Sequence, residues 1–287
     1  MVHPETQRLN TLTFSATIAA VAFCAGFLGS LTGLGGGFIV TPVLTLLFGA
    51  DIRYAIGASL ISIIATSSGA AAAYVKEGFT NLRVGMLLEI ATVLGALVGA
   101  SLVAVFPARV LTVIFGLVLL LSAYLTTRPR AEHLTADLPA DPLAARLRLD
   151  SEYPTAAGPQ RYRVRHVPGG FALMWIAGVL SGLLGIGSGA VKVLAMDQVM
   201  FLPFKVSTAT SNFMIGVTAA ASAGIYLRHG YVDPGLAMPV MLGVLAGSMV
   251  GARLLFGTST RRLRVLFAVV IAVIALQMIY HGALGRG

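Results

Sequence analysis

The stretch Leu31-Thr-Gly-Leu-Gly-Gly-Gly37 recurs 152 residues later as Leu183-Leu-Gly-Ile-Gly-Ser-Gly189, and both copies interrupt apolar sequence. Glycine costs roughly 1 kcal/mol relative to alanine inside a helix, so each cluster predicts a helix break. The backbone amides freed there, with the positive end of the following half-helix, form a natural anion site. Close helix packing through small residues is the alternative. We favour a site because the glycines are contiguous and duplicated.

The two stretches belong to a longer internal repeat, in which residues 25–126 align with residues 177–278 without a gap. Such internal symmetry is the basis on which many membrane transporters build a site between two halves. We therefore predict an N-terminal repeat at 1–127, a linker at 128–168 and a C-terminal repeat at 169–287. Seven glycine pairs coincide: Gly26/Gly178, Gly33/Gly185, Gly35/Gly187, Gly37/Gly189, Gly78/Gly230, Gly95/Gly247 and Gly99/Gly251, together with Ser59/Ser211, Thr66/Thr218 and Tyr74/Tyr226.

The composition of the chain is that of a membrane protein. Hydrophobic residues make up 57% and charged residues 11%, whereas about a quarter of a soluble domain is charged. Most apolar runs approach the roughly 20 residues that a spanning helix needs, and the alternation of a membrane barrel is absent. We predict an all-α, multi-pass protein of the cell membrane, inner or plasma, with about eight to ten membrane segments, four or five in each repeat.

The chain has a net charge of +9, and seven of its arginines lie in the linker between Arg128 and Arg165, together with five acidic residues. Arginine-rich loops stay on the cytoplasmic side, so we expect the linker to be cytoplasmic, against the lipid head groups. Nucleic acid is excluded as a partner, because no recognisable binding module interleaves aromatic with basic residues. The lipid bilayer and a small anion are the expected partners, and a homo-oligomer is left open.

A short apolar piece follows each glycine cluster, at Phe38–Phe48 and at Ala190–Leu202. Helices of this length reach roughly 16–20 Å, short of a hydrocarbon core of about 30 Å, so we expect half-helices or re-entrant segments. If the short piece returns to its starting side, the repeats are parallel; if it crosses, they are inverted. The charges outside the linker do not decide, and we favour inverted repeats from the behaviour of broken helices in transporters.

These motifs resemble the sulfite exporter TauE/SafE family of membrane permeases. The resemblance rests on the first glycine cluster with Phe38-Ile-Val-Thr-Pro42 and Gly57-Ala-Ser-Leu60, then on Gly185-Ile-Gly-Ser-Gly189 and Thr208-Ala-Thr-Ser-Asn212. It covers both repeats. It implies transport of sulfite, of sulfonates such as taurine breakdown products, or of other organosulfur anions, without specifying which.

Lys192 is the strongest single candidate for binding an anion, because it is a cation within an apolar segment. The first repeat has Val40 at the equivalent position. An ammonium costs about 2.5–3.5 kcal/mol at the centre of a membrane helix, so it should face a cavity, a carboxylate or an anionic substrate. Snorkelling to the interface or pairing with Asp197 are the alternatives. Pro42 is likewise replaced by Leu194, so the two half-sites need not be equivalent.

Hydroxyl and amide groups after each short piece can donate hydrogen bonds to an oxyanion, or can bond other helices instead. The predicted substrate-binding set is Gly35, Gly36, Gly37, Thr41 and Ser59 in the first repeat and Gly187, Ser188, Gly189, Lys192, Ser211 and Asn212 in the second.

Glu89 and Asp197 are candidates for carrying a coupling proton, because burial favours a protonated carboxyl. For Glu89, an interfacial salt bridge with Arg83 is the preferred alternative.

We therefore expect a secondary transporter of small anions that works by alternating access and couples to protons or another gradient. An anion channel and a receptor without flux are the alternatives. We predict no enzyme activity, cofactor or metal site, since no GxxxxGK[ST] or HExxH motif occurs.

Overall fold

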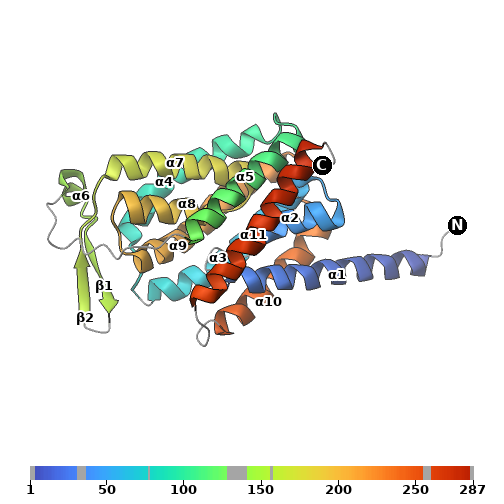
Figure 1. Ribbon diagram of the computed structural model, residues 1–287, viewed down its shortest axis with the longest axis horizontal. Coiled ribbons are helices and arrows are strands. Elements are labelled where there is room, and N and C mark those ends of the chain that lie inside the picture. The colour runs from blue at the N-terminus through green and yellow to red at the C-terminus, as the bar shows by residue number, and fades with distance from the viewer. Residues whose placement is uncertain are drawn as a thin grey trace.

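The computed structural model describes residues 4–30, 37–76, 78–127, 141–155, 158–254 and 260–284. It is almost entirely helical, with one small strand pair (Figure 1). The elements are α1 (Pro4–Ser30), α2 (Gly37–Phe48), α3 (Ile52–Lys76), α4 (Leu82–Leu102), α5 (Ala108–Thr127), α6 (Pro142–Arg146), β1 (Ser151–Thr155), β2 (Gly158–Tyr162), α7 (Val167–Leu184), α8 (Gly189–Leu194), the π-helical η1 (Ala195–Val199), α9 (Phe204–Arg228), α10 (Pro234–Leu254) and α11 (Thr260–Ala283).

In two pairs of equivalent helices, the first and last residues are separated by the same 152 residues as the sequence repeat. Those of α3 and α9 differ by 152 residues at both ends, as do those of α4 and α10. The short pieces also correspond, since α2 begins at Gly37 and α8 begins at Gly189. α2 matches the short piece expected at Phe38–Phe48, whereas in the piece expected at Ala190–Leu202 the α-helix ends at Leu194 and the π-helical η1 continues it to Val199.

The helices pair across the two halves of the chain. α1 packs along α10, α4 packs along α7, α5 packs along α11 and α3 packs against α9. Glycines allow the closest approaches: a Cβ at Gly178 would overlap the backbone of Thr92, and one at Gly26 would overlap the backbone of Val244. These two contacts are equivalent under the offset of 152 residues. Small residues let helix backbones approach closely where lipid gives little drive for helix association.

The relative directions of the helices follow from these contacts. Along α4, Asn81 and Glu89 bond to Thr210 and Thr218 of α9, so α4 and α9 run in the same direction. α3 and α4 are joined by residues 77–81, and two spanning helices joined so closely must cross in opposite directions. α9 therefore runs opposite to α3, which is its counterpart in the repeat.

The first helix fixes the number of crossings. The contacts of Gly243 with Ala19 and of Gly247 with Phe23 show that α1 and α10 run in the same direction. Because α10 runs opposite to α9, α1 and α3 run the same way, and the segment between them must carry the chain back across. Of the two arrangements that the sequence left open, these helix directions favour the inverted one. Both ends of the chain lie at the end of the molecule opposite α6, β1 and β2 (Figure 1).

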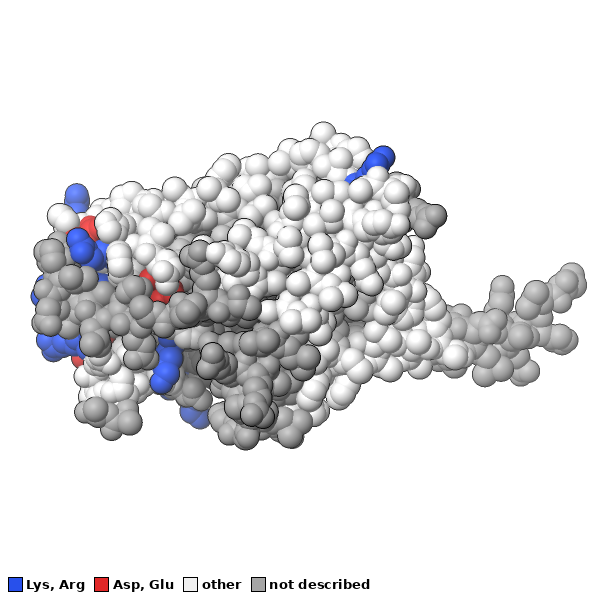
Figure 2. All heavy atoms as spheres, in the orientation of Figure 1, with Lys and Arg blue, Asp and Glu red and all other residues white. Residues whose placement is uncertain are grey.

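The outer surface agrees with a membrane setting. On the face shown in Figure 2, charged side chains gather at the end that carries α6 and the strands, and a broad uncharged band adjoins it. Within the described residues, α4, α5 over Ala108–Leu125, and α7 are long and apolar enough to cross a membrane by length and composition alone. Shorter apolar helical stretches occur in α1, α2, α3, α10 and α11. α9 is less apolar than α4, α5 and α7 because it carries serine, threonine and asparagine.

The second half of the linker forms a small structured unit, an organisation that its polar composition did not predict. β1 and β2 pair antiparallel, and Asn81 joins this unit to the helices. The Asn81 amide donates to Leu149 O at 2.9 Å and to the Tyr162 hydroxyl at 2.8 Å, while its backbone N–H donates to Thr210 Oγ1 at 3.0 Å. Burial raises the pKa of Tyr162 to about 12, so this hydroxyl stays neutral.

Inverted repeats predict that a topology reporter fused after Gly287 and the same reporter inserted in the linker between Thr127 and Asp141 lie on opposite sides of the membrane. An odd number of crossings in the second repeat is the physical reason. Alkaline phosphatase activity and green fluorescence would locate each site, with the arginine-rich linker on the cytoplasmic side. A cytoplasmic signal from the fusion after Gly287 would refute the arrangement.

Gly178→Val should destabilise the protein by about 1–3 kcal/mol, because the new side chain overlaps the α4 backbone at Thr92. Thermal unfolding in detergent would measure the loss. Gly224→Val is the matched control, since a Cβ at this helical glycine meets nothing within 4 Å. Equal melting temperatures for the two variants would contradict the packing role.

Candidate functional site

The helix break in the second repeat is fully described. α7 ends at Leu184, and Gly185, Gly187 and Ser188 then adopt left-handed φ angles of 62°, 68° and 47° before α8 starts at Gly189. Only glycine adopts this region freely, which explains two of the three residue types. Gly35 and Gly36, the predicted site residues of the first break, lie outside the described residues.

The matched serines hold the first carbonyls of the short helices. Ser59 Oγ lies 3.0 Å from Gly37 O and 3.1 Å from Gly185 O, and Ser211 Oγ donates to Gly189 O at 3.4 Å. The Ser59 hydroxyl therefore links the start of α2 to the break after α7. These hydroxyl hydrogens are used by the protein backbone in this conformation, and their role toward an anion stays a prediction.

Lys192 lies at the centre of a buried polar chain. Its side chain is 0% exposed, and Nζ donates to Thr218 Oγ1 of α9 at 2.6 Å. Thr218 Oγ1 in turn lies 2.7 Å from Glu89 Oε1 of α4, to which it donates. We call Lys192, Thr218 and Glu89 the polar triad. It brings together residues from α8, α9 and α4. The sequence had suggested Lys192 for substrate binding and Glu89 for proton coupling, as separate roles.

The triad occurs in only one of the two positions that the repeat provides. The equivalent residues, 152 positions away, are Val40, Thr66 and Met241. Thr66 donates to Ser62 O of its own helix, at 3.0 Å. At one of the two repeat-related positions, Lys192 of the second repeat meets Glu89 of the first, whereas the other position carries the apolar Val40 and Met241.

The alternative interpretation of Glu89 is wrong. Arg83 is exposed and donates to Arg148 O of the linker at 3.0 Å, and no salt bridge joins it to Glu89 in the described part of the chain. Glu89 is 8% exposed because α4 turns it toward α9. Asp197, in η1, is also buried, but it accepts from Gln198 Nε2 at 2.8 Å and forms no ion pair with Lys192.

Several buried polar atoms near these elements have no hydrogen-bond partner among the described residues. They include Thr41 Oγ1, Ser188 Oγ and Glu89 Oε2. Native proteins satisfy the large majority of such atoms, so these are free to meet a ligand, water or ion. Asn212 is half-buried. Gly37, by contrast, is closely packed, because a Cβ there would overlap Ile63, as the small-residue alternative expects.

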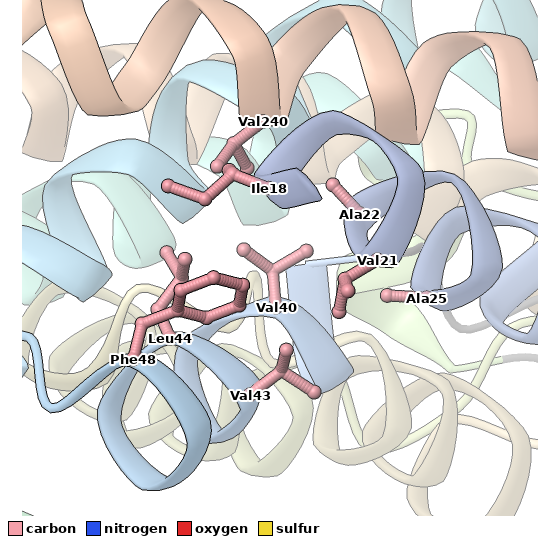
Figure 3. A pocket seen from close by; sticks show the side chains of 9 residues that line it. All are labelled: Ile18, Val21, Ala22, Ala25, Val40, Val43, Leu44, Phe48 and Val240. Atoms are coloured by element: carbon pink, nitrogen blue, oxygen red, sulfur yellow. The ribbon is translucent and has the colours of Figure 1, made fainter. Parts of the chain in front are cut away.

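A small cavity marks the counterpart position in the first repeat. It lies between α1, α2 and α10, and Val40, Ile18 and Val240 are among its lining residues (Figure 3). Its volume is about 10 Å³, and every lining side chain is apolar. The cavity has room for about one water and offers no polar contact to an anion. Val40 therefore faces an apolar cavity, whereas the equivalent position in the second repeat holds the charged side chain of Lys192.

Thr218 is the functional candidate that sequence reasoning missed. The Thr66/Thr218 pair was a signal, because it coincides in both repeats. What the pair could not show is that only the second threonine lies between a lysine and a glutamate.

A family model described as "Sulfite exporter TauE/SafE" matches residues 18–278. "Probable membrane transporter protein YunE" of Bacillus subtilis is 29% identical over 92% of this chain and 97% of its own. "Probable membrane transporter protein YdhB" of the same organism is 30% identical over 82% and 88%. "Probable membrane transporter protein MJ0441" of Methanocaldococcus jannaschii is 26% identical over 90% and 93%. No solved structure matches. With the match to the family model covering most of its length, the chain belongs to the TauE/SafE sulfite exporter family and is a multi-pass membrane transporter.

Proposed function

We propose that the protein is a secondary transporter of small anions in the cell membrane, with sulfite, sulfonates or related organosulfur anions as substrates. The single observation that carries this proposal is Lys192, a cation with no exposed surface between apolar helices. The family description supports sulfur oxyanions among the anions that such a cation could bind.

The physical argument concerns charge. An ammonium inside the bilayer needs an anionic or hydrogen-bonding partner, and Lys192 has no direct ion pair with a carboxylate in the described structure. Thr218 lies between Lys192 and Glu89, so the carboxylate does not contact the ammonium directly. The ammonium can therefore still attract a second anion. Sulfite and sulfonate oxygens accept short, charge-assisted hydrogen bonds from such a donor. The unpartnered hydroxyls of Thr41 and Ser188 would add neutral donors.

Inverted repeats support alternating access around this region. Broken helices from the two halves can rock against each other and open a fixed site to one side at a time. The Ser59 hydroxyl, which lies within hydrogen-bonding distance of carbonyls at both breaks, ties the two halves together at this point. A channel is the competing function, since broken helices also build pores. Saturable counterflow would distinguish the carrier from a channel, and ligand binding without flux would indicate a receptor.

We predict that Lys192→Ala abolishes anion flux in proteoliposomes, because it removes the cation without which the bilayer interior repels the substrate. Flux of sulfite, of taurine-derived sulfonates and of simple carboxylates would be measured with and without a pH gradient. Lys192→Met, which removes the charge but keeps most of the side-chain volume, should behave alike.

Lys205→Ala is the matched control for this experiment, since Lys205 is an exposed lysine at the start of α9. Its flux should equal that of the wild type. Monodisperse extraction in detergent would show that each variant is folded. Wild-type flux by folded Lys192→Ala would remove Lys192 from the site.

A further inference from the structure

We propose that Glu89 is the internal anion that the substrate replaces: protonation of Glu89 releases Lys192 to the substrate anion, so that one proton travels with each monovalent anion. This inference rests on the proposed function and adds the coupling ion, the stoichiometry and the charge of the substrate.

The first step of the argument is the bonding of Thr218. Its hydroxyl has one hydrogen and two acceptors in reach, Glu89 Oε1 at 2.7 Å and Met214 O at 2.9 Å. When Glu89 is ionised, its negative charge attracts that hydrogen, because bonds to charged acceptors are the stronger ones. When Glu89 is protonated, the Thr218 hydroxyl can return to Met214 O and still accept from Lys192. The triad therefore has two hydrogen-bonded arrangements that need no movement of the backbone.

The second step is the free oxygen of Glu89. Oε2 is buried and has no partner within the described part of the protein. A proton can bind there without breaking an existing hydrogen bond. One oxygen of the carboxylate is consequently linked to Lys192 through the Thr218 hydroxyl, and the other remains open to a proton.

The third step is the absence of a competing charge among the described groups on the packed elements. α7 carries no titratable side chain, and Asp197 of η1 is held by Gln198. The Tyr226 hydroxyl donates to Leu183 O. Arg83, Lys205, Arg228 and Tyr124 are exposed, and Arg109 of α5 donates to Gly282 O. Within this part of the chain, Glu89 and Lys192 are therefore each other's electrostatic partners.

Charge balance then sets the stoichiometry. Ionised Glu89 with Lys192 is neutral, and protonated Glu89 with Lys192 and a monovalent anion is also neutral. Both states avoid the cost of a net charge in the membrane interior. The proton binds Glu89 on one side, enters with the anion, and leaves on the other side as Glu89 takes Lys192 back. A divalent anion would leave the loaded site with a net negative charge, so monovalent sulfonates and hydrogen sulfite fit it best.

Glu89→Gln provides the main test, because glutamine imitates the protonated carboxyl. Wild-type and variant proteoliposomes would be given radiolabelled methanesulfonate, which stays monovalent, and in parallel sulfite. An outside pH one unit lower should drive up to about tenfold accumulation in the wild type, and this should not change with an imposed membrane potential. Glu89→Gln should keep counterflow exchange but lose the accumulation. Glu152→Gln, at an exposed glutamate of the linker, is the matched control and should accumulate as the wild type does.

Three results would overturn this inference. One is accumulation by Glu89→Gln equal to that of the wild type, and another is loss of counterflow in a folded Glu89→Gln protein. The third needs no variant: wild-type accumulation that follows the membrane potential would rule out a neutral cycle. Each leaves the proposed anion transport intact, whereas an absence of wild-type flux for both anions under any gradient would remove the proposed function itself.

Discussion

The rest of the structure depends on the close approach of helix backbones at glycine. In lipid, apolar helices gain little by touching one another, because the acyl chains are as apolar as leucine. Gly95, Gly99, Gly178 and Gly182 bring α4 and α7 together so closely that a Cβ at any of them would overlap a backbone carbonyl of the other helix. The matching contacts between α1 and α10 complete a framework in which each half holds the other, and the breaks and the polar triad are positioned by that framework.

Within this symmetric framework, the chemistry is asymmetric. The backbone contacts of the two halves correspond, down to Ser59 and Ser211 at the starts of α2 and α8. The buried charges do not correspond, since Lys192 and Glu89 have Val40 and Met241 as counterparts. Duplication supplies two similar half-helices that can move against each other, whereas one buried cation supplies a single binding event for each cycle. A second lysine at position 40 would add a buried positive charge with Met241 at the repeat position where Lys192 has Glu89.

The sequence predicted the features that depend on local chemistry. The second glycine cluster indicated the break between α7 and α8, the offset of 152 residues indicated the helix correspondence, and segment length indicated that α2 and α8 are short. Features that depend on which helix faces which were harder to predict. Most helices are apolar around their whole circumference, so periodicity does not show the buried face. For Glu89, the sequence therefore offered only Arg83, close along the chain, as a partner for the alternative interpretation, whereas its partner Thr218 lies 129 residues away.

The first helix of each repeat packs against the other repeat, α1 on α10 and α7 on α4. This arrangement has a consequence for biogenesis. α1 ends at Ser30 and its packing partner α10 begins only at Pro234, about 200 residues later. At a synthesis rate of about 5–20 residues per second, α1 waits in the membrane for roughly 10–40 s before that partner exists. During this interval its glycine face is covered only by lipid or by an insertion chaperone. The first half cannot complete its own packing, so assembly of the helix framework must wait until α10 has been synthesised.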